Sequence, residues 1–148
     1  MVTAFAVIAN KGKLVRPHIV DRIIRENGEI IKTQTKEVRQ VISPRTSTLL
    51  SGMLVSAVRN GWGRKAAVPG YYIAGKTGTA QVAGPEGGYS DKTVHSFVGF
   101  GPVDDPVFAM IVKLNDPKSV EFAADSATPL FGHLADFLLK YYQIPPDE

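Results

Sequence analysis

The sequence predicts an α+β fold in which one antiparallel sheet of three strands is packed against helices. Two observations lead to this prediction. Strand-like segments follow one another between residues 71 and 114 and are separated by turn-forming residues, which is typical of antiparallel neighbours. Segments with apolar residues at helical spacing stand before and after this block. The expected order is therefore helix, hairpin, helix, three strands and helix, within the single domain that 148 residues of 44% hydrophobic content can form.

The first helix is expected over residues 1–9, where apolar side chains recur at helical spacing. It should end at residues 10–12, because Asn10 or Gly12 can adopt the left-handed conformation that caps a helix. No capping residue precedes the helix. A helix that starts at the first residue is expected to belong to a longer chain.

A small peripheral hairpin is expected next. Residues 14–24 are rich in β-branched side chains, and Ile30 and Ile31 follow a short polar segment. That segment contains Asn27 and Gly28, a pair typical of the type I′ turn, in which both central residues have positive φ. The pair therefore predicts a two-residue hairpin loop.

The second helix is expected to begin at Ser43, whose hydroxyl can cap it, with Pro44 at the first helical position. It should end near residues 59–61. Its apolar face is predicted from residues at three-to-four spacing, namely Leu49, Leu50, Met53, Leu54, Ala57 and Val58.

Three strands are expected at residues 71–82, 94–100 and 107–114. The glycine-rich segment 83–93 between the first two is expected to be a flexible loop. The third strand is apolar at successive positions, which is typical of a strand with material packed on both faces.

The last helix is expected to start at Thr128 and Pro129 and to end before Pro145 and Pro146. The residues predicted to face the core are Leu130, Leu134, Phe137, Leu138 and Tyr141.

Composition excludes several kinds of site. There is no cysteine, and therefore neither a disulfide framework nor a thiolate metal site. His18, His95 and His133 are far apart in the sequence, so we expect no metal and no cofactor. The net charge of +3 is spread along the chain without a basic stripe, which argues against a nucleic-acid partner. No apolar run reaches the roughly 20 residues that span a bilayer, so the chain as given is expected to be soluble.

The segment Gly75–Ala80 combines a lysine, two threonines and two glycines inside an expected strand. Thr77 and Thr79 point to the same side of a strand, where two hydroxyls can hold a carboxylate. Lys76 adds a positive charge that attracts an anion, and an edge strand offers free N–H groups for a developing oxyanion. The tripeptide Lys-Thr-Gly at residues 76–78 also occurs in ordinary strands with a solvated lysine, so the motif by itself does not establish a site.

The surrounding residues resemble class B penicillin-binding proteins, whose penicillin-recognising domain carries a Lys-Thr-Gly motif. Residues 68–81 resemble the strand that holds this motif, and residues 95–102 resemble the strand that follows it. Residues 3–18 are similar to the helix and extended segment ahead of that strand, and residues 144–147 to common C-terminal endings. The resemblance covers nearly the whole chain in order. It implies a serine acyl-transferase that cross-links bacterial peptidoglycan.

The resemblance also implies a role for each residue of the motif. Lys76 would join the hydrogen-bond network of the active-site serines. Thr77, Gly78 and Thr79 would bind the terminal carboxylate of a D-Ala-D-Ala stem peptide or of a β-lactam. The backbone N–H of Thr79 would form one arm of the oxyanion hole, and the N–H of the nucleophilic serine would form the other.

Two of the three motifs of that family are absent. No serine here has a lysine three residues later, and no Ser-x-Asn occurs. Residues 1–148 are therefore expected to be the C-terminal portion of a transpeptidase domain, inactive alone. The resemblance implies that the parent is anchored at the outer face of the bacterial cytoplasmic membrane. It also implies a sheet of five strands, so the strand 107–114 should have an unpaired edge that favours dimerisation or strand exchange.

Two other functions are compatible with these residues. The chain could be part of a β-lactamase or β-lactam sensor of the same fold, or a non-catalytic interaction module. Two aromatic side chains near the motif have less defined roles. Trp62 is either an exposed aromatic near the cleft or packs on the helix that begins at Ser43, and we expect the packing. His95, one strand from Lys76, is expected to be structural rather than catalytic.

Overall fold

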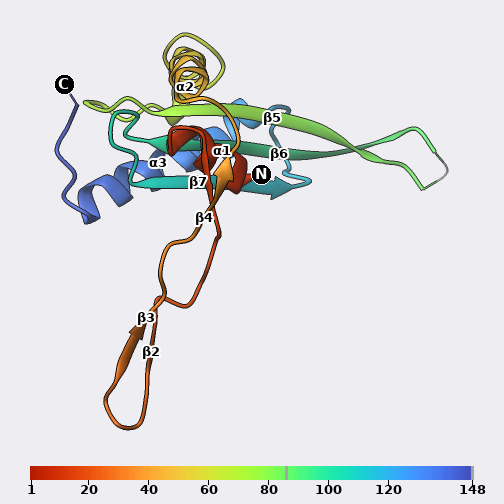
Figure 1. Ribbon diagram of the computed structural model, residues 1–148. Coiled ribbons are helices and arrows are strands. Elements are labelled where there is room, and N and C mark those ends of the chain that lie inside the picture. Colours follow the sequence, from red (N-terminus) through yellow and green to blue (C-terminus); the bar gives the residue numbers. More distant parts are fainter. Residues whose placement is uncertain (86, 148) are drawn as a thin grey trace.

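A three-stranded antiparallel sheet forms the centre of the computed structural model, which describes residues 1–85 and 87–147 (Figure 1). Its strands are β5 (Ala74–Ala83), β6 (Tyr89–Gly101) and β7 (Phe108–Asn115), in the order β5-β6-β7. This order confirms the predicted α+β fold and leaves β5 and β7 as the edge strands. Within the described residues, no helix is both long and apolar enough to cross a membrane.

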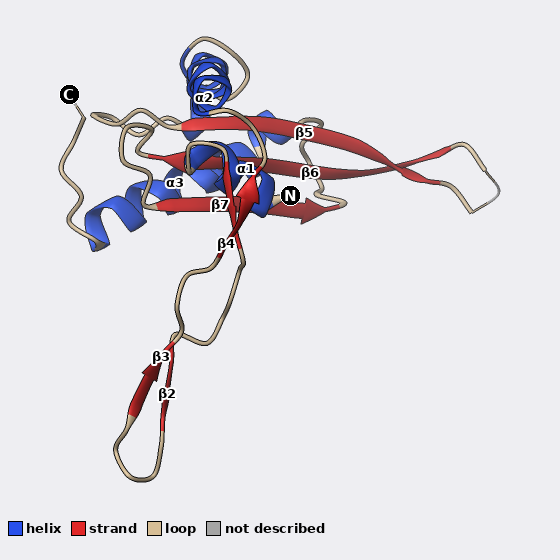
Figure 2. Cartoon of the chain, viewed as in Figure 1, coloured by secondary structure: helices blue, strands red, loops and turns tan. Residues whose placement is uncertain are grey.

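Helices lie on both sides of this sheet (Figure 2). Helix α1 (Val2–Ala9) contacts β6 and β7 on one side, and α3 (Ala127–Tyr141) contacts the same strands on the other. Helix α2 (Pro44–Arg59) packs against β5. Two short 3-10 helices, η1 (Arg64–Ala66) and η2 (Ala123–Asp125), connect these elements to the sheet.

The main core lies between the sheet and α3. Phe131 of α3 is fully buried, and its ring centroid lies 4.6 Å from that of Phe97 in β6. Val112 of β7 and Leu139 of α3 belong to the same cluster. The core therefore ties β6 and β7 to one face of the last helix.

That face of α3 is not the predicted one. Leu130, Leu134, Phe137 and Tyr141 are 39–68% exposed, whereas Phe131, Gly132, Ala135 and Leu139 are buried. The prediction was wrong because α3 is apolar on both sides, so helical spacing alone does not select a face. Small residues decide the packing: a Cβ added to Gly132 would lie 2.6 Å from the carbonyl oxygen of Lys65 in η1.

This close approach makes a testable prediction. Gly132→Ala is expected to lower the free energy of unfolding by about 1–3 kcal/mol, because η1 or α3 must move to admit the methyl group. Gly52→Ala in α2 is the matched control, since an added Cβ there meets nothing within 4 Å. It should raise stability by about 0.5–1 kcal/mol through helix propensity. Urea unfolding measures both changes, and equal changes would contradict the packing of α3 on η1.

Helix α2 begins as predicted. Ser43 caps it, and the N–H of Thr46 donates to the Ser43 hydroxyl oxygen at 3.1 Å. The predicted apolar face is only partly buried: Val58 is 1% exposed, but Leu49 and Met53 are 61% and 69% exposed. Two serines, Ser47 and Ser51, occupy buried positions of this helix instead. Their hydroxyls are accommodated because each donates to a backbone carbonyl, that of Ile8 or of Ser47.

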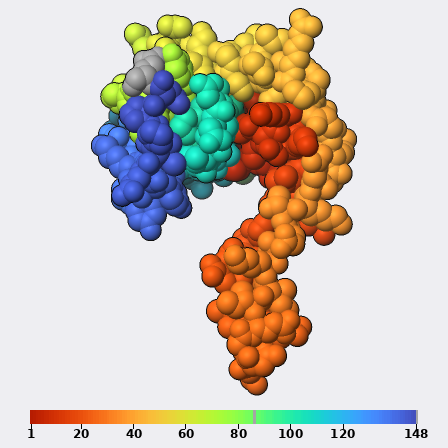
Figure 3. All heavy atoms as spheres, turned by 60° about the vertical axis from the view of Figure 1, so that its left-hand side comes forward, coloured from red at the N-terminus to blue at the C-terminus, as the bar shows by residue number. Residues whose placement is uncertain are grey.

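The segment between α1 and α2 forms a long arm that projects from the sheet (Figures 1 and 3). Strands β1 (Lys13–Val15) and β4 (Glu37–Gln40) pair at its base, and β2 (Arg22–Ile24) and β3 (Ile30–Lys32) pair at its end. The peripheral hairpin is thus confirmed. The pairing of β1 with β4 was not predicted, because it joins short segments 22 or more residues apart.

The turn of the outer hairpin differs from the predicted type I′ turn. Only Gly28 has positive φ there, at 82°, and Asn27 does not. The N–H of Gly28 donates to the carbonyl of Arg25, and the N–H of Glu29 donates to the Asn27 side chain. A three-residue loop closes the hairpin, because the Asn27 side chain stabilises an Asx turn in place of the left-handed conformation.

The connection between β5 and β6 is shorter than predicted. The segment 83–93 was expected to be a flexible loop, but β6 already begins at Tyr89. The hydroxyl of Ser90 donates to the carbonyl of Val82 and links the two strands close to the turn that joins them. Glu86 lies outside the described residues. As expected, β7 has one unpaired edge and incompletely buried faces.

Candidate functional site

The predicted motif residues lie on β5, an edge strand of the sheet. Thr77 and Thr79 face the same side, opposite Phe97 and His95 of β6 in the register. Both β6 partners are fully buried. The two threonines therefore stand on a rigid base, while their own side chains reach the surface at the edge of the sheet.

The backbone of these two threonines faces away from the sheet. The carbonyl of Thr93 in β6 accepts from the N–H of Asp116, on the β7 side. Backbone groups alternate in direction along an antiparallel strand, so those of residues 95 and 97 also point toward β7. Their β5 partners, Thr79 and Thr77, are then in non-hydrogen-bonded pairs and direct their N–H and C=O groups to the free edge.

The two threonine hydroxyls are arranged as donors. The Thr77 hydroxyl oxygen accepts from the Lys76 ammonium at 3.1 Å. The Thr79 hydroxyl oxygen accepts from the N–H of Ala123 in η2, also at 3.1 Å. Each oxygen thus receives one hydrogen bond from an N–H group, which leaves its own O–H proton to donate outward. Two such donors on one side of a strand suit a carboxylate.

The glycines of the motif allow close packing inside the sheet. A Cβ added to Gly78 would lie 2.7 Å from the Ser96 hydroxyl oxygen, and one added to Gly75 would lie 2.5 Å from the Phe97 ring. The structure shows that these groups belong to β6, so the glycines let β5 lie against its neighbour.

A pocket of about 270 Å³ opens beside the two hydroxyls. Its lining residues are Trp62, Thr77, Thr79, Phe122 and Ala124. The predicted packing of Trp62 on α2 was wrong, because its side chain is 81% exposed and lines this pocket instead. Apart from the two hydroxyls, the walls are apolar.

Lys76 lies on the rim of the site. Its ammonium group donates to the carbonyl and hydroxyl oxygens of Thr77, and its side chain is exposed. A smaller hollow of about 120 Å³ separates Lys76 from Trp62 and the end of α2. Across residues 1–85 and 87–147, none of the ion pairs found involves Lys76. Its positive charge therefore acts on whatever anion enters the site.

His95 is a buried residue that supports the site. It is fully buried, and its ring nitrogens contact the hydroxyls of Thr93 at 3.0 Å and Ser126 at 2.8 Å. Ser126 follows η2, which supplies the Ala123 N–H to Thr79. His95 thus fixes the loop that orients Thr79, in line with the structural role predicted for it.

Sequence reasoning missed the contribution of η2. Ala123 and Phe122 reach the site although they lie more than 40 residues after Thr79. Their segment shows neither a helical nor a strand period, and no sequence signal connects it to β5. The turn after β7 brings them there.

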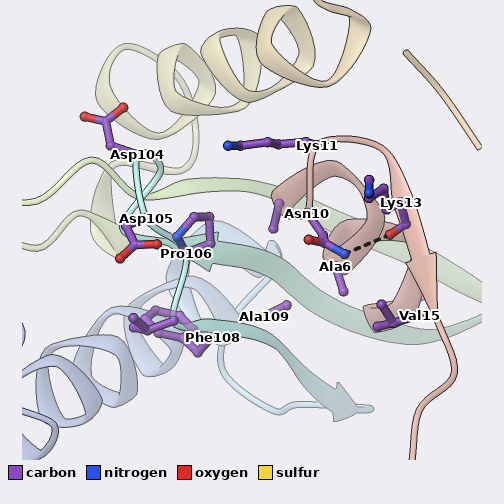
Figure 4. A pocket seen from close by; sticks show the side chains of 12 residues that line it. Ala6, Asn10, Lys11, Lys13, Val15, Asp104, Asp105, Pro106, Phe108 and Ala109 are labelled. Atoms are coloured by element: carbon purple, nitrogen blue, oxygen red, sulfur yellow. Dashed lines mark hydrogen bonds between the residues drawn. The ribbon is translucent and has the colours of Figure 1, made fainter. Parts of the chain in front are cut away.

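A larger hollow of about 590 Å³ lies beside β7, at the opposite edge of the sheet from β5 (Figure 4). Lys11 and Lys13 line it from the α1 side, and Asp104 and Asp105 from the loop before β7. Its charges are mixed, and it contains neither of the two threonines. The two threonines of the predicted site therefore line the pocket beside β5 and not this larger hollow.

The β5 pocket contains binding groups without a nucleophile. Neither serine nor cysteine is among its lining residues. The nearby Ser96 hydroxyl is directed at the carbonyl of Gly78 and belongs to the interior of the sheet. The described site can hold and polarise an anionic ligand, but the part that attacks a carbonyl is not among these residues.

Comparison with known proteins agrees with this geometry. Residues 1–136 match the penicillin binding protein transpeptidase domain. The chain is 36% identical to the penicillin-binding protein PbpB of Mycolicibacterium smegmatis, over 98% of this chain and 24% of that protein. It is 38% identical to the peptidoglycan D,D-transpeptidase FtsI of Escherichia coli, over 68% of this chain and 17% of that protein. The chain thus spans a quarter or less of the length of these relatives.

A solved structure extends the similarity to three dimensions. Penicillin binding protein 3 of Mycobacterium tuberculosis, complexed with aztreonam, superposes with a TM-score of 0.87 at 29% identity. The match covers 99% of this chain and 35% of that chain. Fold and sequence agree, and the chain belongs to the transpeptidase domain family of the penicillin-binding proteins.

Proposed function

We propose that residues 1–148 are the C-terminal portion of a peptidoglycan D,D-transpeptidase domain and form the carboxylate-binding wall of its active site. One observation carries this proposal. The hydroxyls of Thr77 and Thr79 both accept from N–H groups and so both donate toward the same pocket. The ligand is the terminal carboxylate of a D-Ala-D-Ala stem peptide, or the carboxylate of a β-lactam. The complex of penicillin binding protein 3 with ampicillin, whose ring system carries a carboxylate, supports the second ligand class.

The residues of the motif have separate roles in this proposal. Thr77 and Thr79 hold the carboxylate with their hydroxyls. Gly78 between them belongs to the same binding strand, and its lack of a side chain leaves room for the Ser96 hydroxyl of β6. The backbone N–H of Thr79, on the free edge of β5, stabilises the oxyanion of the tetrahedral intermediate. Lys76 supplies positive charge to the bound anion and to the hydrogen-bond network around the nucleophile.

The nucleophile comes from another part of the domain. A serine there attacks the penultimate carbonyl of the stem peptide, an ester forms, and the amide bond to the terminal D-Ala breaks. The leaving D-Ala amine takes up a proton. An amine of a second stem peptide then attacks the ester, which forms the cross-link and frees the serine. Residues 1–148 carry no Ser-x-x-Lys, so the isolated chain does not catalyse either step.

The remaining half of the domain also explains the free edge of β7. We expect strands of that half, or a second copy of this chain, to pair with β7. We expect the parent to act at the outer face of the bacterial cytoplasmic membrane, where peptidoglycan is cross-linked. Similarity to relatives named D,D-transpeptidases supports this expectation.

Labelled penicillin tests this proposal. The isolated chain should form no covalent adduct, whereas the domain completed with its upstream part should form a stable one. In the completed domain, Thr77→Val should slow acylation by about 10- to 100-fold, because one hydrogen bond to a charged group is lost. Thr48→Val in α2 is the control and should leave the rate unchanged, because its hydroxyl contacts only the Pro44 carbonyl. Rapid turnover without a stable adduct would instead indicate a β-lactamase, and an adduct on the isolated chain would contradict the assigned division of roles.

A further inference from the structure

Trp62 is an unusual surface residue. Its side chain is 81% exposed, although a tryptophan is among the most favourable side chains to bury. It stabilises no core of the described chain. It lines the pocket of Thr77 and Thr79 on one side and the hollow of Lys76 on the other. Its indole therefore stands between the two parts of the proposed site.

The backbone fixes this position. A Cβ added to Gly61 or Gly63 would lie 2.8 or 2.9 Å from the carbonyl oxygen of Ala57 in α2. The N–H of Gly63 also donates to that carbonyl at 3.1 Å. The two glycines thus hold the loop tightly against the end of α2. The side chain between them is exposed and lines the pocket of Thr77 and Thr79.

Apart from the two threonines, the residues that line the pocket are apolar. Trp62 stands there with Phe122, which is 50% exposed, and with Ala124. A ligand whose carboxylate accepts from the hydroxyls of Thr77 and Thr79 brings the group next to that carboxylate into this apolar lining. An apolar group gains contact with the indole there, whereas a polar group loses its hydration.

We propose that Trp62 determines specificity by stacking on the apolar side chain next to the carboxylate of the bound ligand. The proposal rests on the proposed function of Thr77 and Thr79 as the carboxylate anchor. The D-Ala-D-Ala terminus remains the substrate, and the ligands that gain from this contact are analogues whose C-terminal D-amino acid has a side chain larger than a methyl group. Stacking on Trp62 is expected to tighten such a ligand by about three- to tenfold over its D-alanine counterpart.

The chain provides its own probe, since Trp62 is its only tryptophan. Intrinsic fluorescence of the 148-residue chain is titrated with N-acetyl-D-alanyl-D-alanine, with N-acetyl-D-alanyl-D-phenylalanine and with the carboxamide of the second peptide. Both acids should change the emission in a saturable way. The phenylalanine peptide should bind about three- to tenfold more tightly, and the carboxamide should not bind.

Variants separate the two parts of the proposal. Affinities of Trp62→Ala and Trp62→Phe are measured from the amide NMR shifts of Thr79. The preference for the larger peptide should vanish in Trp62→Ala and be partly kept in Trp62→Phe, while Leu49→Ala on the exposed side of α2 should leave it unchanged. If wild type shows no preference, or Trp62→Ala keeps it, the role of Trp62 is wrong and the carboxylate anchor stands. If the carboxamide binds as well as the acid, or neither acid binds, the anchor itself is wrong.

Discussion

Replacing Phe131 with alanine is expected to lower the free energy of unfolding by about 3–5 kcal/mol. Phe131 is fully buried in α3, with its ring centroid 4.6 Å from that of Phe97 and 6.3 Å from that of Phe108. The substitution removes a ring from the centre of the core and leaves a cavity that the surrounding strands fill only partly. A small domain is stabilised by about 5–15 kcal/mol in total, so this loss is a large share.

Phe137→Ala on the same helix is the matched control. Phe137 is 60% exposed and stacks on Tyr141 at the surface, so its loss should cost less than about 1 kcal/mol. Urea unfolding monitored by circular dichroism gives both values. A larger cost for Phe137 than for Phe131 would mean that the opposite face of α3 is the buried one.

Replacing Lys76 with methionine is expected to slow acylation of the completed domain by penicillin about 100- to 1000-fold. Methionine keeps much of the length of the side chain but removes its charge, and with it the hydrogen bond to the Thr77 hydroxyl. The developing oxyanion and the ligand carboxylate then lose their nearest cation on β5. Stability should change little, because the Lys76 side chain is exposed.

Lys113→Met tests whether the effect is specific. Lys113 is an exposed lysine on β7, two strands from Lys76 in the sheet. Its loss changes the net charge by the same amount and should leave the acylation rate within about twofold of wild type. The role assigned to Lys76 would be contradicted if both variants were slowed equally, or if neither was slowed.

The sequence predicted most elements because their signals are local. Ser43 and Pro44 mark the start of α2 correctly, and the motif Lys76–Thr79 is on an edge strand as predicted. Caps, turns and apolar spacing each depend on a few residues that are close together in the sequence.

What the sequence did not predict depends on contacts between distant segments. Which face of α3 is buried is decided by the fit of Gly132 on η1, and helical spacing contains no information about that fit. The hydrogen bond from Ala123 to Thr79 and the exposure of Trp62 likewise arise from loops that meet only in the folded chain. The sequence therefore predicted the strand that carries the motif, but not the other residues that form the walls of the pocket.

A crystal structure of the completed domain acylated by a penicillin tests the carboxylate anchor most directly. The ligand carboxylate should lie within hydrogen-bonding distance of the hydroxyl oxygens of both Thr77 and Thr79. Its acyl carbonyl oxygen should lie at the N–H of Thr79. A carboxylate bound elsewhere, with both hydroxyls turned to solvent, would show that this edge of β5 is not the anion-binding wall.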